Sequence, residues 1–248
     1  MIRVAAPSPG ERAASLRIVS WNIHGSVGRD RRCDPDRILR HIRALAPDIL
    51  ALQEVDGRTH FGRQARAFEF FAEALGPHLV EARLVRRTDR DYGHLLWSRW
   101  PMIESAMHLL PDGRIEQRGV IDATVATPAG PLRILSTHFG LWPAARRRQA
   151  KMLAGLAGEG RSPTLALGDF NEWRADGPVH RTLSAVLPVV ASPLTWPSRR
   201  PSVRMDRLYA SAGIGILRAE ATVEGAQASD HLPLVADITL PPPGDGGA

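Results

Sequence analysis

Short apolar segments separated by Pro, Gly and polar residues run through the chain, and they constrain its fold more than any other feature. Residues 16–23 (LRIVSWNI) and 48–55 (DILALQEV) predict strands that are buried on both faces. Further strands are predicted near residues 81–85, 94–98, 103–110, 119–125, 132–137, 164–167, 203–209, 214–219 and 232–240. The run of strands between residues 81 and 137, divided by Pro and Gly turns, has the pattern of a meander.

Helical signals occur between these strands. Asp34 is placed to cap a helix that begins at Pro35, and apolar residues then recur at helical spacing up to residue 45. Further helices are predicted near residues 66–75, 144–156 and 179–186. Because helices alternate irregularly with many strands, we expect an α+β protein with two mixed, mainly antiparallel sheets packed between helices. One domain is expected over residues 15–240, with flexible tails at 1–14 and 241–248.

Composition excludes several classes of protein. Cys33 is the single cysteine, which rules out an internal disulfide framework and a thiolate-rich zinc site. No apolar run approaches the roughly 18 residues of a spanning helix. Residues 1–15 do not resemble a secretory signal, so we expect a cytoplasmic protein without a transmembrane segment. The formal net charge of +6 favours anionic partners, although nearly all basic residues are Arg, which is equally typical of compositional bias.

Polar residues stand at the ends of the apolar segments, where one edge of a sheet can deliver several side chains to one cleft. They are Asn22, His24, Glu54, His138, Asp169, Asn171, Asp230 and His231, with Asp206 inside VRMDRLY. Each alone is compatible with a turn or a cap, since Asn and Asp are ordinary turn residues. Their combination at the ends of apolar strands is the inventory that phosphoester hydrolysis requires.

These residue types predict a hydrolytic site with a divalent cation. Mg²⁺ prefers oxygen ligands, which Glu54 with an Asp would supply, and Glu54 and Asp169 are expected at adjacent strand ends. A bound cation lowers the pKa of water and neutralises phosphoryl oxygens. Asp169 is suited to orienting or deprotonating the attacking water, and Asn171 to holding a phosphoryl oxygen. His231 would bind the phosphate or move a proton if a carboxylate such as Asp206 fixes its tautomer.

Four motifs in order along the chain carry a resemblance to a known family. WNIHG begins at Trp21, LQEVD at Leu52, GDFNEW at Gly168 and SDHLPL at Ser229. Together they resemble the endonuclease/exonuclease/phosphatase superfamily over about residues 16–240. The chain looks like a small bacterial member of the phosphatase and phosphodiesterase branch. The resemblance implies a four-layer αββα sandwich, in agreement with the strand-rich pattern.

The resemblance also implies metal and phosphate ligands. Glu54 corresponds to the direct metal ligand of such enzymes, and Asn22 to a residue that supports metal and phosphate. Asp230 corresponds to a residue near or on the metal. Asp169 and Asn171 take the positions of the residues that activate water and position the phosphate.

The histidines indicate the branch of the family. His231 corresponds to the residue on the scissile phosphate, and Asp206 takes the place of its acidic partner. His138 in STHFG resembles a histidine that contacts the phosphate in lipid and nucleotide phosphoesterases. The DNA-repair members carry an acid where this chain has His24, so a repair nuclease is disfavoured.

Five residues are candidates for contact with the substrate: Arg118, Tyr92, His24, His94 and Trp196. Arg118 would clamp a phosphate bidentately, or else pair with Glu116 at the surface. His24 fits either the site or strand-end packing. His94 stands where small bacterial members commonly have Asn, so polar contacts in that wall are expected to differ. Trp196 would line a substrate loop or anchor it.

The expected function is Mg²⁺- or Mn²⁺-dependent hydrolysis of a phosphomonoester or phosphodiester of modest size by a monomeric enzyme. The alternative is an endonuclease or exonuclease acting on DNA or RNA. Its backbone contacts would involve the ARRR run at 145–148, but a solvated helix face is the simpler interpretation of that run. No long insertion offers a surface for gripping a duplex, so nucleic acid is not the favoured partner. An inactive binding relative is less well supported because Glu54 and the SDH motif are intact.

Overall fold

The computed structural model describes residues 15–59, 62–86, 90–112, 116–159 and 163–242. The first of two six-stranded sheets contains β1 (Leu16–Asn22), β2 (Ile49–Asp56), β3 (Leu79–Val85), β4 (Tyr92–Ser98), β11 (Gly215–Ala221) and β12 (Leu234–Thr239), in the order β11-β12-β1-β2-β4-β3. The second contains β5 (Met102–Leu110), β6 (Arg118–Thr127), β7 (Gly130–His138), β8 (Thr164–Asp169), β9 (Val189–Ala191) and β10 (Asp206–Ala210), in the order β5-β6-β7-β8-β10-β9. The expected tail at 1–14, and residues 243–248 of the tail expected at 241–248, lie outside the described residues.

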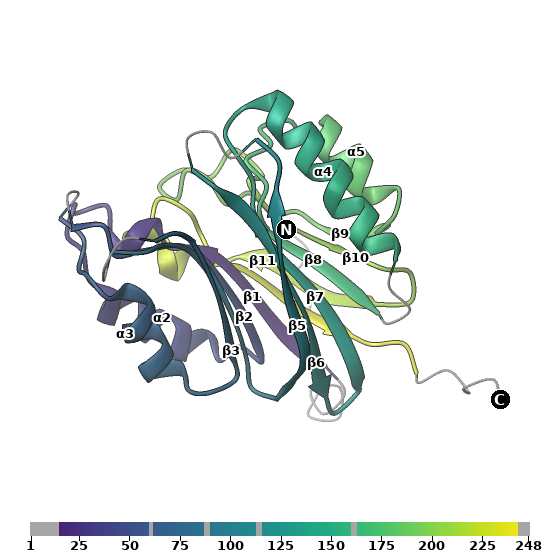
Figure 1. Ribbon diagram of the computed structural model, residues 1–248, viewed down its shortest axis with the longest axis horizontal. Coiled ribbons are helices and arrows are strands. Elements are labelled where there is room, and N and C mark those ends of the chain that lie inside the picture. Colours follow the sequence, from purple (N-terminus) through teal and green to yellow (C-terminus); the bar gives the residue numbers. More distant parts are fainter. Residues whose placement is uncertain (1–14, 60–61, 87–89, 113–115, 160–162, 243–248) are drawn as a thin grey trace.

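Helices cover the outer face of each sheet, so the molecule has four layers, αββα (Figure 1). The helices are α2 (Pro35–Leu45) and α3 (Ala67–Leu75) on the first sheet, and α4 (Pro143–Gly158) and α5 (Pro178–Ser184) on the second. Two short 3₁₀ segments are η1 (His24–Ser26) and η3 (Val223–Gln227). The predicted α+β class and sandwich are therefore confirmed.

Three apolar clusters hold the layers together. One lies between the sheets and joins residues such as Ile18 and Ile134. The second joins β1 and β2 to Ile38 and Phe71 on the first pair of helices, and the third joins β7 and β8 to the second pair. Because central strands such as β2 and β8 are covered on both faces, they carry the continuous apolar runs seen in the sequence.

Three details differ from the predicted elements. The run of strands between residues 81 and 137 is not one meander, because the chain passes from the first sheet to the second between β4 and β5. Strand β9 was not predicted, since its three residues are too few to show a period. Strand β10 begins at Asp206, three residues later than expected, because the preceding segment forms only an isolated bridge between Trp196 and Val203.

Two parallel crossovers place the polar strand ends at one edge of the sandwich. Strands β1 and β2 are parallel and connected through α2, and β7 and β8 are parallel and connected through α4. Their neighbours β4, β6, β10 and β12 run antiparallel to them. The carboxyl ends of the parallel strands therefore meet the amino ends of the antiparallel strands. In the described part of the chain, no helix is long and apolar enough to cross a membrane.

The start of α2 provides a test of the local analysis. The Asp34 carboxylate accepts a hydrogen bond of 2.8 Å from the Arg37 amide, as the capping prediction requires. We expect Asp34→Ala to lower the free energy of unfolding by about 1 kcal/mol in urea titrations, because a helix amide loses its partner. Asp34→Asn keeps a capping oxygen and should retain most of that stability. Equal losses in the two variants would contradict the capping role.

Candidate active site

The crossover edge gathers eight of the predicted residues from two sheets. Four stand at or near the carboxyl ends of parallel strands, and four at or just before the amino ends of antiparallel ones. The first four are Asn22, Glu54, His138 and Asp169, and the second four are Tyr92, Arg118, Asp206 and His231. In the second sheet, Asp169 is in register with both His138 and Asp206.

Three of the predicted site residues at or beside this edge, including His24 with φ 49°, have backbone conformations that non-glycine residues rarely adopt. Glu54 has φ 55° and lies at a bulge in the pairing of β2 with β4. Asn171, two residues beyond β8, has φ 51°. Such conformations cost on the order of 1–3 kcal/mol and concentrate at functional sites, where a bulge redirects a side chain.

The Asn22 side chain joins the two sheets. Its amide nitrogen donates to Glu54 Oε1 at 3.0 Å and to Asp169 Oδ2 at 3.0 Å, and its oxygen accepts from the His24 amide at 3.0 Å. The two carboxylates were expected on adjacent strands, but β2 and β8 belong to different sheets. They approach each other because both strands end at the same edge and share this amide.

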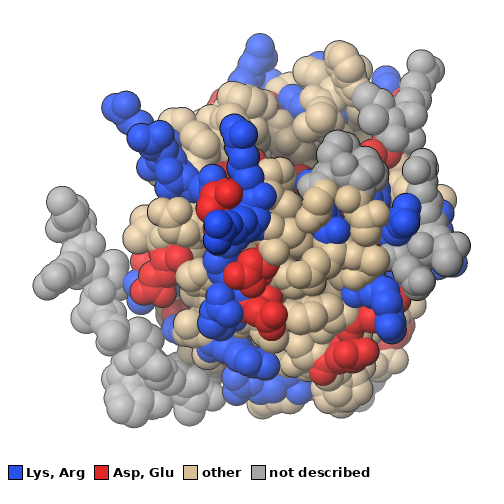
Figure 2. All heavy atoms as spheres, turned by 90° about the vertical axis from the view of Figure 1, so that its left-hand side faces the viewer, with Lys and Arg blue, Asp and Glu red and all other residues tan. Residues whose placement is uncertain are grey.

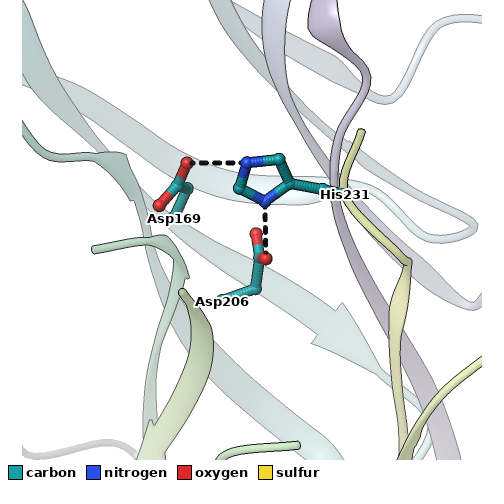
Figure 3. Close-up of side chains that lie close together, drawn as sticks. All are labelled: Asp169, Asp206 and His231. Carbon is teal, nitrogen blue, oxygen red and sulfur yellow. Dashed lines mark hydrogen bonds and ion pairs between the residues drawn. The ribbon is translucent and has the colours of Figure 1, made fainter. Parts of the chain in front are cut away.

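Asp206, His231 and Asp169 form a buried chain of charged groups (Figure 3). His231 Nδ1 lies 2.8 Å from Asp206 Oδ2, and His231 Nε2 lies 3.8 Å from Asp169 Oδ2. Burial alone would lower the pKa of His231, but the two carboxylates outweigh it and raise this pKa to about 10. The imidazole is therefore positively charged at neutral pH.

Asp169 is the carboxylate most affected by burial. Its side chain is 2 % exposed, and burial raises its pKa to about 7, against the opposing effect of His231. Oδ1 accepts a hydrogen bond of 2.8 Å from the Asn171 amide, which fixes the carboxylate plane. A carboxyl group that titrates near neutral pH can take a proton from water.

A second histidine lies on the other side of Asp169. His138 Nε2 is 3.6 Å from Asp169 Oδ2 and 3.2 Å from the Asn171 amide nitrogen. Arg118 Nη1 lies 3.1 Å from His138 Nδ1 and donates to the Tyr92 hydroxyl at 2.9 Å. Burial and the Arg118 charge hold the pKa of His138 well below its ordinary value. His138 is thus neutral, and its one acceptor nitrogen accepts either from Arg118 at Nδ1 or from Asn171 at Nε2.

Arg118 forms the Glu116 contact that the sequence left open, and its phosphate contact stays a prediction. It faces His138 within the site, and its Nη2 also lies 3.3 Å from Glu116 Oε2. The Tyr92 ring below it is covered by Arg58, whose guanidinium carbon is 4.0 Å from the ring centroid. Arg58 also donates to Glu116 at 2.6 Å. The sequence analysis missed Arg58 because it follows β2 in a polar stretch without a motif of its own.

Asp230, His24 and Trp196 form the rim of the site. Asp230 Oδ1 is 3.7 Å from His24 Nδ1, and its other oxygen accepts from the Trp196 indole nitrogen at 3.4 Å. The side chains of His24 and Asp230 are 40 % and 45 % exposed, so both are accessible from solvent. The contacts with metal and substrate that we predicted for these residues stay predictions.

Two predicted residues are more buried than expected. His94 is 1 % exposed, and burial lowers its pKa to about 3, so it lies within the sandwich and not on the site surface. This burial argues against the substrate contact predicted for it. In the ARRR run, Arg147 and Arg148 are exposed, but Arg146 is buried and its Nη1 donates to the Leu141 carbonyl. The solvated-face interpretation is therefore wrong for Arg146, which supports the loop before α4.

The donor set fits a hard divalent cation. Glu54 and Asp169 each offer a carboxylate oxygen that accepts a hydrogen bond from the same Asn22 nitrogen, so the two oxygens lie close together. Asp206 Oδ1 is buried without a hydrogen-bond partner, and burial raises the pKa of Asp169, so a cation here would stabilise the charged form of both carboxylates. Oxygen donors of this kind suit Mg²⁺ or Mn²⁺.

A second possible metal cluster consists of Asp169, Asp206 and His231, whose ligand atoms lie within 4.8 Å of one another. In this cluster His231 Nδ1 and Asp206 Oδ2 share a hydrogen bond of 2.8 Å. The three residues are a second candidate for a cation, and their residue types also suit proton transfer.

Comparison with known proteins agrees with this geometry. Residues 19–231 match the model of the endonuclease/exonuclease/phosphatase family. YbhP of Escherichia coli K12 is 26% identical over 245 residues, covering 91% of this chain and 97% of YbhP. An endonuclease/exonuclease/phosphatase from Beutenbergia cavernae superposes with a TM-score of 0.73 at 24% identity, over 92% of this chain and 72% of that one. The human nocturnin catalytic domain with bound sulfate gives a TM-score of 0.68 at 19% identity, over 91% and 94% of the two chains. The chain belongs to the endonuclease/exonuclease/phosphatase family, whose members hydrolyse phosphoesters.

Proposed function

We propose that this chain is a divalent-metal-dependent phosphoesterase that acts on small phosphate esters. The observation that carries the proposal is the convergence of Glu54, Asn22 and Asp169 with His138 and His231 at one edge of the sandwich. Carboxylates for a cation lie there beside neutral and cationic donors for a phosphoryl group. The sulfate bound to the nocturnin domain is a tetrahedral anion, which supports phosphate as the ligand of this fold.

Each residue then has a defined role in hydrolysis. Glu54 and Asp169 would hold Mg²⁺ or Mn²⁺, with Asn22 orienting both and Asp230 joining from the rim. A bound cation would supply charge that neutralises the phosphoryl oxygens and acidifies water. Asp169, which lies beside His231 and is oriented by the Asn171 amide, accepts a proton from the attacking water.

The histidines hold the phosphoryl group. The His231 imidazolium, oriented by Asp206, donates from Nε2 to one phosphoryl oxygen. Neutral His138 and the amide of Asn171 donate to another. The water oxygen bonds to phosphorus, the P–O ester bond breaks, and the leaving oxygen takes up a proton from solvent.

The charge distribution favours a small substrate over a duplex. Basic and acidic side chains are interspersed on the face that carries α2 and α3 (Figure 2). Arg37 and Arg40 on α2, for example, pair with Asp30 at 2.9 Å and Asp34 at 3.6 Å. A surface for a nucleic-acid backbone needs a continuous basic track, which paired charges do not provide.

The metal assignment gives the first kinetic prediction. Bis-p-nitrophenyl phosphate should be hydrolysed with Mg²⁺ or Mn²⁺ but not with EDTA. Glu54→Gln should need a much higher metal concentration for half-maximal rate, because a neutral amide is a weaker ligand for a hard cation. Glu104→Gln, on exposed β5, is the control and should behave as the parent. A Glu54→Gln variant with unchanged metal dependence would show that the ligand assignment is wrong.

The histidine proposed to bind phosphate, His231, gives the second kinetic prediction. His231→Ala should lose about 10²- to 10⁴-fold in kcat while keeping its circular dichroism spectrum, because a positioned charge or proton donor is lost. His108, whose Nε2 lies 3.3 Å from Asp122, is a second His–Asp pair away from the site. His108→Ala should therefore retain kcat within about twofold. Equal losses in the two variants would point to a structural effect.

The pH dependence of kcat gives the third kinetic prediction. His231 is charged below its raised pKa of about 10, so activity that needs the imidazolium should fall only at alkaline pH. Removing the Asp206 charge lowers the pKa of His231. The fall in kcat at alkaline pH should therefore occur about one pH unit or more lower in Asp206→Asn than in the parent. An alkaline limb at the same pH in both proteins would exclude the imidazolium role.

A further inference from the structure

An exposed pair of tryptophans lies beside the rim of the site. Trp173 is 57 % exposed and packs edge-on against Trp196, with 5.0 Å between ring centroids. Trp196 is itself tied to Asp230 through its indole nitrogen. The pair therefore forms an aromatic surface that continues directly from the site into solvent.

A hollow of about 490 Å³ opens at another side of the site, beside Arg118. Its apolar lining includes Leu141 and Trp142, each 65 % exposed, and Ala145 at the start of α4. Asp112 and Arg148, which pair with each other, lie at its border. The hollow is thus a mainly apolar space that begins where the Arg118 guanidinium ends.

The aromatic pair rests on a buried arginine. Arg207 is fully buried and donates to the backbone carbonyls on both sides of Trp173, at 3.1 Å to Glu172 and 2.8 Å to Arg174. It also donates to the Ala175 carbonyl at 3.2 Å. Removing a guanidinium from water is costly, and here the hydrogen bonds fix a loop whose largest side chain stays exposed.

The hollow has a comparable support. Buried Gln149 accepts from the Gly140 amide at 2.9 Å and donates to the Pro111 carbonyl at 2.9 Å, which holds the two walls together. Arg146 holds the Leu141 carbonyl, and Pro143 restricts Trp142 to its extended conformation. Both apolar surfaces are therefore pre-formed, as in small-molecule sites.

Strand order places the two surfaces on different sides of the phosphate-binding residues. The hollow is lined by Asp112, Glu116 and Arg118 near the ends of β5 and β6 and by the segment after β7, and the aromatic pair comes from the segments after β8 and before β10. His138 and Asn171 stand between them, at the ends of β7 and β8, in a sheet ordered β5-β6-β7-β8-β10-β9. A phosphate at these residues would have an apolar surface on either side.

We propose that the substrate is a small phosphodiester whose two ester groups each have an apolar or aromatic face. One group packs on Trp173 and Trp196, and the other enters the hollow against Leu141 and Trp142. The inference rests on the proposed function, because it takes the phosphate position from His138, Asn171 and His231. A phosphomonoester would fill only one of the two surfaces and would leave the other exposed to water.

The test measures binding separately from turnover. Diphenyl phosphate, methyl phenyl phosphate and dimethyl phosphate are titrated calorimetrically into the full chain with Mg²⁺, before measurable phenol release. Diphenyl phosphate should bind at least about tenfold more tightly than dimethyl phosphate, because each ring stacks on a pre-formed surface, and methyl phenyl phosphate should be intermediate. Equal affinities for the three esters would overturn the proposal.

Variants assign the two surfaces. Trp173→Ala and Trp142→Ala should each weaken diphenyl phosphate binding by about three- to tenfold and leave dimethyl phosphate binding unchanged, whereas Trp173→Phe should retain most of the affinity. Ile103→Ala removes another exposed apolar side chain, 63 % exposed at the far end of β5, and should change nothing. An effect in only one of the two alanine variants would contradict the claim of two ester sites.

Turnover separates this inference from the proposed function. A chain that discriminates among the three esters in this way but releases no phenol or nitrophenol would contradict the hydrolytic assignment and support the ester sites. A chain that hydrolyses bis-p-nitrophenyl phosphate yet binds the three esters equally would support the hydrolytic assignment and contradict the two ester sites.

Discussion

The site depends on keeping buried carboxylates charged at the open end of a β-sandwich. Asp169 and Asp206 are almost fully removed from water, which is costly for anions without nearby positive charge or donors. The His231 imidazolium supplies the charge, and the amides of Asn22 and Asn171 supply hydrogen bonds. Burial raises the pKa of Asp169 despite these contacts, and a divalent cation would stabilise its charged form further.

The topology explains why these groups can meet. Two crossover connections make β1 and β2 parallel in one sheet and β7 and β8 parallel in the other, so four strand ends point the same way. Antiparallel neighbours then begin at that edge and contribute residues such as Arg118 and Asp206. Behind this edge β7 and β8 lie so close at Gly168 that a side-chain carbon there would be 1.9 Å from the Thr137 carbonyl oxygen.

The sequence predicts most of this arrangement because apolar strands and their polar ends are local patterns. The layers, the positions of α2 and β2, and the convergence of Asn22, Asp169 and His231 all follow from such patterns together with four motifs. What the sequence could not predict depends on pairing between distant segments. The separation of β2 from β8, the burial of His94 and Arg146, and the contact of Arg58 with Tyr92 are set by sheet pairing and packing, for which no local signal exists.

The central claim is that one cation and one phosphoryl group bind together between the two sheets. The most direct measurement is an anomalous-diffraction map of crystals soaked with Mn²⁺ and inorganic phosphate. The account predicts a manganese peak on Glu54 and a phosphate within hydrogen-bond distance of Asn171, His138 and His231. A manganese peak on Asp206 and His231, or a phosphate bound away from both histidines, would contradict it.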